Sequence, residues 1–114
     1  MGKCPVVPPA GGSEKPFVCG TYTGDGTPER VIELGFTPSA VFVTTANGLM
    51  GDVHSKGGLA LQDAPVRAGA SNLYPIVEIV DGGFKVFYNN KTPFNQYTND
   101  SASAYNPFHY IAFR

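Results

Sequence analysis

The sequence predicts an all-β domain, an antiparallel β-sandwich of about six to seven short strands with an extended N-terminal arm. Its apolar residues occur in short runs rich in Val, Ile, Phe and Tyr, which favour strands and are too short for stable helices. The chain has 114 residues with 14 Gly and 10 Pro. That is about twice the average share of these two residues, so turns are frequent. The length fits one domain with a single core.

The strand pattern is clearest in the run RVIELGFTPSAVFVTT, from Arg30 to Thr45. Gly35 and Pro38 flank its centre and mark a reversal between two strands rather than one long strand. Turns such as Gly24-Asp25-Gly26 separate further runs of strand length. The predicted strands are Phe17 to Tyr22, Arg30 to Gly35, Ser39 to Thr45, Gly58 to Leu61, Pro75 to Val80, Phe84 to Asn89 and Phe108 to Phe113.

A hairpin is predicted from Pro75 to Asn89, around the turn Asp81-Gly82-Gly83. Glycine supplies the positive φ that a tight reversal requires at no steric cost. Side chains alternate between the two faces of a strand, so one set faces the core and the other faces outward. The inward set is Val77, Ile79, Phe84, Val86 and Tyr88. Phe87 then lies on the second face, where a neighbouring sheet or subunit is expected to cover it.

Residues 1–16 hold four Pro, three Gly and three charged residues, and they show no apolar periodicity. This composition predicts an extended arm before a sandwich domain at 17–114. The opening MGKCPVVPPAGG is too short and too broken by Pro for a signal peptide. The two cysteines, Cys4 and Cys19, could form one bridge. Without a signal peptide, we expect two reduced, partly buried thiols instead.

Three segments do not follow a strand pattern, namely residues 46–56, 62–73 and 90–107. The last is rich in Asn, Ser, Thr and Tyr, and loops of this length are uncommon unless they serve a function. Aromatic faces beside amide groups suit the recognition of a sugar or a protein surface. The alternative is a covered crossover between edge strands. The candidate ligand-binding residues are Asn95, Tyr97, Asn99 and Tyr105.

Composition excludes several classes of function. With 8 Lys plus Arg against 9 Asp plus Glu, the net charge is -1, so the chain lacks the basic field that nucleic-acid binding needs. No apolar run approaches the roughly 20 residues that span a bilayer. Charged residues make up only 15% of the chain and hydrophobic residues 42%. Together with apolar residues such as Phe87 and Phe113 on second strand faces, this predicts self-association.

Catalytic and metal-binding motifs are also missing from the sequence. Asp52, His54 and Ser55 are close together, but a catalytic triad needs an oriented base and an oxyanion hole from separate elements. His109 is expected to be a strand histidine at the surface or an interface. The spacing of two His and two Cys matches no zinc motif. We therefore expect no enzyme activity, no catalytic residue, no metal and no cofactor.

Four segments together carry a family resemblance: GTYTGDGTPERVIELGFTPSAVFV, GGLAL, IVEIVDGGFKV and YIAFR. They resemble small β-sandwich domains of tailed-phage and prophage structural proteins, of the tail-fibre, receptor-binding or capsid decoration type. Over fewer motifs, the chain also resembles the H-type lectin-like sandwich, whose domains assemble as trimers. The chain has no Trp, and Tyr110 stands in the closing strand where those lectins have one. No sugar-binding residue is therefore carried over.

The resemblance implies a non-enzymatic virion structural protein, a capsid decoration or appendage subunit made in the host cytoplasm. It implies a homotrimer that contacts other virion proteins, such as the major capsid or tail proteins. The alternative is a receptor- or carbohydrate-binding tail-fibre module that recognises a host surface glycan. A Pro-rich arm loses little conformational freedom when it docks on a neighbour. The candidate partner contacts are Pro5, Val6, Val7, Pro8, Pro9 and Phe87.

Overall fold

The computed structural model describes residues 16–48, 56–69, 72–89 and 96–114, and over these residues it contains strands and turns but no helix. The predicted N-terminal arm lies outside the described residues, apart from Pro16. The strands are β1 (Phe17–Tyr22), β2 (Glu29–Glu33), β3 (Ala40–Thr44), β4 (Gly58–Leu61), β5 (Val66–Gly69), β6 (Leu73–Val80), β7 (Gly83–Phe87) and β8 (Phe108–Phe113).

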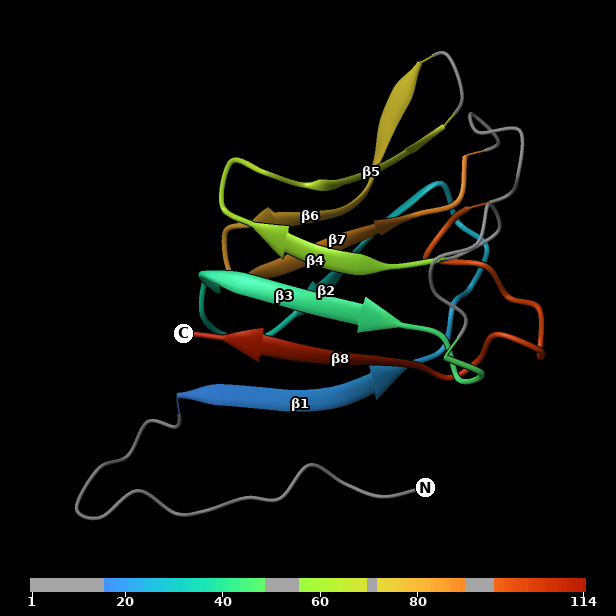
Figure 1. Ribbon diagram of the computed structural model, residues 1–114. Coiled ribbons are helices and arrows are strands. Elements are labelled where there is room, and N and C mark those ends of the chain that lie inside the picture. The colour runs from blue at the N-terminus through green and yellow to red at the C-terminus, as the bar shows by residue number, and fades with distance from the viewer. Residues whose placement is uncertain (1–15, 49–55, 70–71, 90–95) are drawn as a thin grey trace.

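These strands form two four-stranded antiparallel sheets that pack face to face (Figure 1). Sheet A has the order β1-β8-β3-β4, and sheet B has the order β2-β7-β6-β5. The all-β antiparallel fold predicted from the sequence is confirmed. The strand number is eight within the described residues, rather than six to seven.

The additional strand is β5, which lies in the segment that sequence analysis assigned to a loop. Its four residues include Arg67 and Gly69, so it has no apolar run to identify it. It pairs with β6, and the register shifts between Val66 and Arg67. Pairing with a longer neighbour forms this strand, because its own residues have little β propensity.

The join at residues 35–38 does not form a hairpin between neighbouring strands. β2 pairs with β7 in sheet B, whereas β3 pairs with β8 and β4 in sheet A. The reversal at Gly35, whose φ is 82°, therefore carries the chain from one sheet to the other. By contrast, the predicted β6–β7 hairpin is present, with Val80 opposite Gly83 and Ile79 opposite Phe84.

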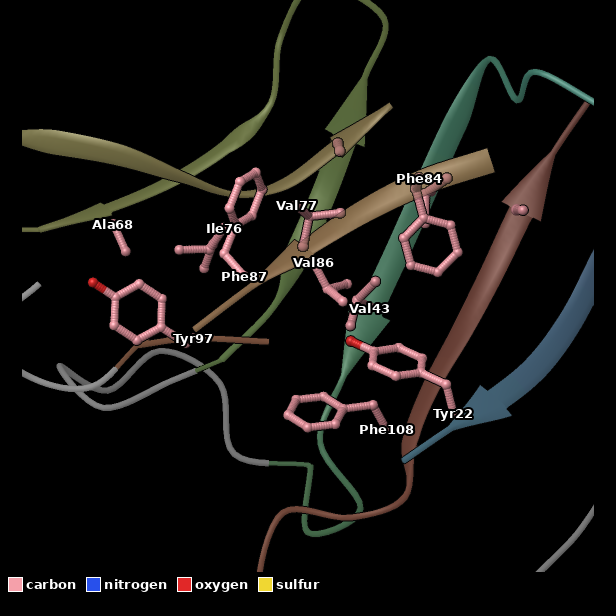
Figure 2. Close-up of a cluster of buried hydrophobic side chains, with 13 residues drawn as sticks. Tyr22, Val43, Ala68, Ile76, Val77, Phe84, Val86, Phe87, Tyr97 and Phe108 are labelled. Carbon is pink, nitrogen blue, oxygen red and sulfur yellow. The ribbon is translucent and has the colours of Figure 1, made fainter. Parts of the chain in front are cut away.

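The core lies between the two sheets (Figure 2). Sheet B contributes Val77, Phe84 and Val86, which are 0% exposed, as the hairpin pattern predicted. Ile79 and Tyr88, predicted to face inward with them, are partly buried and pack against the core. From sheet A, the buried residues are Tyr22, Val41, Val43, Ala60, Phe108 and Ala112.

Phe87 is buried within the chain, which corrects its assignment as a partner contact. Its side chain is 4% exposed and belongs to the core cluster together with Ile76 and Tyr97. The reason is that the segment after β7 returns to the ends of β6 and β7. Thr98 Oγ1 accepts a hydrogen bond from the Phe87 amide at 3.3 Å and donates one to the Ile76 carbonyl. The Asn99 amide donates to the Phe87 carbonyl at 3.0 Å.

Tyr22 connects this returning segment to the centre of the sandwich. Its ring stacks on Phe108 at a centroid distance of 5.2 Å and meets Phe84 edge-on at 6.1 Å. Its hydroxyl donates a 2.6 Å hydrogen bond to the Thr98 carbonyl. Burial strongly raises the pKa of the Tyr22 hydroxyl, so this group stays protonated and keeps donating.

Candidate interaction surface

The side of sheet A that points away from the core is apolar across all four strands. The register places Phe17 opposite Phe113 and Cys19 opposite Ile111, and it places Phe42 on β3 opposite Ile111. These residues alternate along their strands with the buried ones, so their side chains lie on the opposite face. We call this surface the outer face of sheet A; it consists of Phe17, Cys19, Thr21, Ala40, Phe42, Thr44, Leu59, Leu61, His109, Ile111 and Phe113.

Three large apolar side chains on this face are exposed. Leu59 is 55% exposed, Leu61 is 47% exposed and Phe113 is 38% exposed. The Phe17 and Phe113 rings lie 6.3 Å apart between centroids. No member of the face is Asp, Glu, Lys or Arg. Isolated exposed apolar residues are ordinary, but a continuous apolar surface over several strands indicates a contact site.

The outer face of sheet B has the opposite character. Glu29, Glu33 and Lys85 lie on it, and Glu78 faces Lys85 across the β6–β7 pair. Lys85 Nζ lies 3.2 Å from Glu29 Oε1. The Glu29 side chain is 59% exposed and the Lys85 side chain 26% exposed, and burying such charged groups in an interface carries a desolvation cost. Among the described residues, the outer face of sheet A carries no charged side chain, whereas sheet B combines charged groups with the apolar residues Val31 and Leu73, which are 39% and 61% exposed.

Cys19, on the outer face of sheet A, is disulfide-bonded in the structure. This corrects the expectation of reduced thiols. Cys4, the other cysteine of the sequence, lies outside the described residues. The pairing could not be predicted from composition, because composition does not describe where a thiol lies in the fold.

At the end of the sandwich where β1 ends and β8 begins, Asn99 organises a cluster of polar groups. Its side-chain amide donates to Asp25 Oδ1 at 2.7 Å and to the Thr27 carbonyl at 3.0 Å. Asp25 Oδ1 also accepts from the Thr27 hydroxyl at 2.6 Å and from the Thr27 amide at 3.0 Å. The hydrogen bonds from Thr27, and then the one from Asn99, lower the pKa of Asp25 to about 2.

A buried ion pair lies at the same end. Lys56 Nζ is 3.5 Å from Asp100 Oδ2, and the two side chains are only 1% and 8% exposed. The ammonium group also lies 4.5 Å from the centroid of the Tyr105 ring. Burial lowers the pKa of Lys56, and the charge of Asp100 opposes that shift. The pair fixes the segment before β4 against the loop that leads to β8.

The loop residues predicted to bind a ligand serve mainly in this packing. Tyr97 and Asn99 are 0% exposed, so neither side chain is accessible to a ligand in this structure. Tyr105 is half-buried against Lys56. Asn95 lies outside the described residues, as do the arm residues Pro5, Val6, Val7, Pro8 and Pro9. The sequence predicted a binding role for the loop residues because the burial of side chains in an irregular segment cannot be predicted from a local pattern.

The remaining candidate sites give weaker support for a binding or catalytic function. A recess of about 210 Å³ is lined by Thr37, Gln62, Asp63, Ile79, Val80 and Asp81. Pockets for drug-sized ligands usually measure about 300–1,000 Å³. Asp52, His54 and Ser55 lie outside the described residues. The described part of the chain has no group of three or more His, Cys, Asp or Glu placed to hold a metal ion. It also has no helix long and apolar enough to cross a membrane.

The chain was compared with protein-family models, with curated proteins and with solved structures, and nothing matched in any of the three comparisons.

Proposed function

We propose that this protein is a non-enzymatic structural subunit that acts by association with other protein subunits. The observation that carries this proposal is the uncharged outer face of sheet A, with Leu59 and Leu61 about half exposed. Exposed apolar surface costs about 25 cal/mol per Å² relative to its burial, so covering this face favours association. The outer face of sheet B carries Glu29, Glu33 and Lys85, whose desolvation opposes burial of that face.

The setting we propose is the virion of a tailed phage, with the protein as a capsid decoration or appendage subunit. The four sequence segments that resemble phage structural domains support this setting. Such a subunit associates with itself as a homotrimer and contacts neighbouring virion proteins. The sandwich suits this role because its core and returning loop form a self-sufficient scaffold, leaving one face for contact.

The second candidate is a receptor- or carbohydrate-binding tail-fibre module. The observation in its favour is the ordered loop end, where Asn99 and the Lys56–Asp100 pair fix the loops that frame Tyr105. Rigid loops on a β-scaffold are a common basis for recognition. A glycan array tests this candidate: specific binding that Tyr105→Ala abolishes, with thermal stability retained, supports it.

Light scattering after size exclusion tests the association proposal. The wild-type protein is expected to be oligomeric at micromolar concentration, and Leu59→Asp with Leu61→Asp is expected to be monomeric. Val31→Asp is a matched control, because Val31 is 39% exposed on the outer face of sheet B. A monomeric wild-type protein, or equal loss of association in the control, contradicts the proposal.

A further inference from the structure

We propose that the N-terminal segment of this chain, residues 1–15, packs on the β1–β8 side of the outer face of sheet A, held there by a disulfide between Cys4 and Cys19. The inference rests on the proposed function in one respect, namely that the β4 side of the face contacts a neighbouring subunit. It assigns one contact surface and its occupant, and it leaves Leu59 and Leu61 on β4 for a neighbouring subunit.

The tether follows from the position of Cys19. Its side chain lies on the outer face, opposite Ile111 and on the same strand as Phe17. It is disulfide-bonded, and the sequence contains one further cysteine, Cys4. A bond within the chain therefore brings the residues around Cys4 to the apolar surface itself. Cα atoms joined by a disulfide are usually about 5.5–6 Å apart, so the bond holds Cys4 close to β1.

The length of the segment permits this path. β1 is an edge strand of sheet A and begins at Phe17. Residues 5–16, which separate Cys4 from Phe17, can span about 40 Å when extended. The distance across the sheet from β1 to β3 is only about 10 Å, because neighbouring strands lie about 4.8 Å apart. The chain can thus leave Cys4, cross the face and return to the start of β1.

The chemistry of the segment matches the surface that it covers. Pro5-Val6-Val7-Pro8-Pro9-Ala10 is uncharged and apolar, and its charged neighbours Lys3, Glu14 and Lys15 lie outside this run. Proline has no amide hydrogen, so a segment with Pro at three of six positions is a poor additional strand for the edge of β1. Packing of its side chains against the flat of the sheet avoids that penalty. Its limited freedom also reduces the entropy lost on docking.

The size of the face also favours a short segment as its occupant. Four strands of about five residues give a surface of roughly 19 by 16 Å. A standard protein interface buries about 800 Å² on each partner, which is more than this face offers. An extended run of six residues is about 19 Å long and covers about two strands in width. The run from Pro5 to Ala10 therefore covers Phe17 and Ile111 and enlarges the surface available to a neighbouring subunit.

The test uses the full-length chain carrying Leu59→Asp and Leu61→Asp, the variant expected to be monomeric, so that self-association does not cover the face. Peptide mapping without reductant is expected to find Cys4 linked to Cys19 within one chain. Hydroxyl-radical labelling of Phe17 and Ile111 is then compared with labelling after Val6→Asp and Val7→Asp. Because a charge is disfavoured on an apolar surface, labelling of Phe17 is expected to rise about threefold. Ser13→Asp, outside the apolar run, is the control and is expected to leave it unchanged.

Two results overturn the inference. One is the absence of a Cys4–Cys19 link within a monomeric chain. The other is that the Cys4–Cys19 link is present but labelling of Phe17 and Ile111 is the same in three proteins: the parent, the variant with Val6→Asp and Val7→Asp, and the control. Circular dichroism confirms that each variant keeps its strands. The measurement is made on monomers, so a negative result for the N-terminal segment does not contradict the association proposal. If the protein proves not to associate, the docking of the N-terminal segment can still be tested in the same way.

Discussion

The rings of Phe17 and Phe113 lie 6.3 Å apart on the outside of sheet A, although they come from strands near opposite ends of the chain. Phe113 continues this contact toward Ala40 on β3, the strand that pairs next to β8. The pair thus connects the edge strand with the centre of the sheet on a surface that carries no charge. This relationship is the basis for assigning function to a sheet face rather than to a loop.

The buried ion pair should be essential for stability. Lys56→Met leaves the Asp100 carboxylate buried without its ammonium partner, and we expect a loss of about 3–5 kcal/mol in the free energy of unfolding. Lys85→Met removes a lysine that pairs with the exposed carboxylate of Glu29, so a loss of about 0–1 kcal/mol is expected there. Urea denaturation at pH 7 measures both. Equal losses in the two variants would show that Lys56 and Asp100 do not act as a buried pair.

Tyr22 should make the free energy of unfolding fall as the pH becomes alkaline. Its folded-state pKa is raised by burial, so the folded protein retains a proton that the unfolded chain loses above about pH 10. Stability is therefore expected to fall as the pH rises above 10, by up to about 1.4 kcal/mol per pH unit from this residue. Tyr22→Phe should reduce this slope while also removing the hydrogen bond to Thr98. Chemical denaturation between pH 9 and about 11 checks it, and an unchanged slope in the variant contradicts the assignment.

Asp25 should make the free energy of unfolding fall as the pH becomes acidic. Hydrogen bonds from Thr27 and Asn99 hold its folded-state pKa at about 2, below the ordinary value of 3.8. Its contribution is present above that ordinary value and is lost as the pH falls toward 2. Asp25→Asn should flatten the loss of stability across this window in urea denaturation. Asp63→Asn, at an exposed turn, is the matched control for removing one carboxylate.

Much of the fold could be predicted because short apolar runs identify strands directly. The bounds predicted for β1, β4 and β8 agree with the structure, and the β6–β7 hairpin has its predicted turn. β5 could not be predicted, since pairing with β6 forms it and its own residues have little strand preference. Nor could the exchange between sheets at Gly35 be predicted, because local sequence does not specify which strand is the partner.

The candidate site could be predicted only in part, for a physical reason. An excess of apolar surface was inferred from composition and from alternation, with Phe113 named, and Phe113 is indeed exposed. The same reasoning applied to Phe87 was wrong, because the segment around Thr98 returns to cover it. Asn99 was assigned to binding, yet its amide holds Asp25 and Thr27 in place. Burial of irregular segments depends on contacts distant in sequence, which local patterns do not encode.

The most direct test of the account is residue-level hydroxyl-radical labelling of the wild-type protein as its concentration is raised through the range where it associates. Labelling of Leu59 and Leu61 is expected to fall together as the β4 side of the outer face of sheet A becomes covered, while labelling of Val31 on sheet B stays constant. If Val31 becomes protected instead, or if the outer face of sheet A stays equally labelled while the mass increases, association uses another surface and the central claim is contradicted.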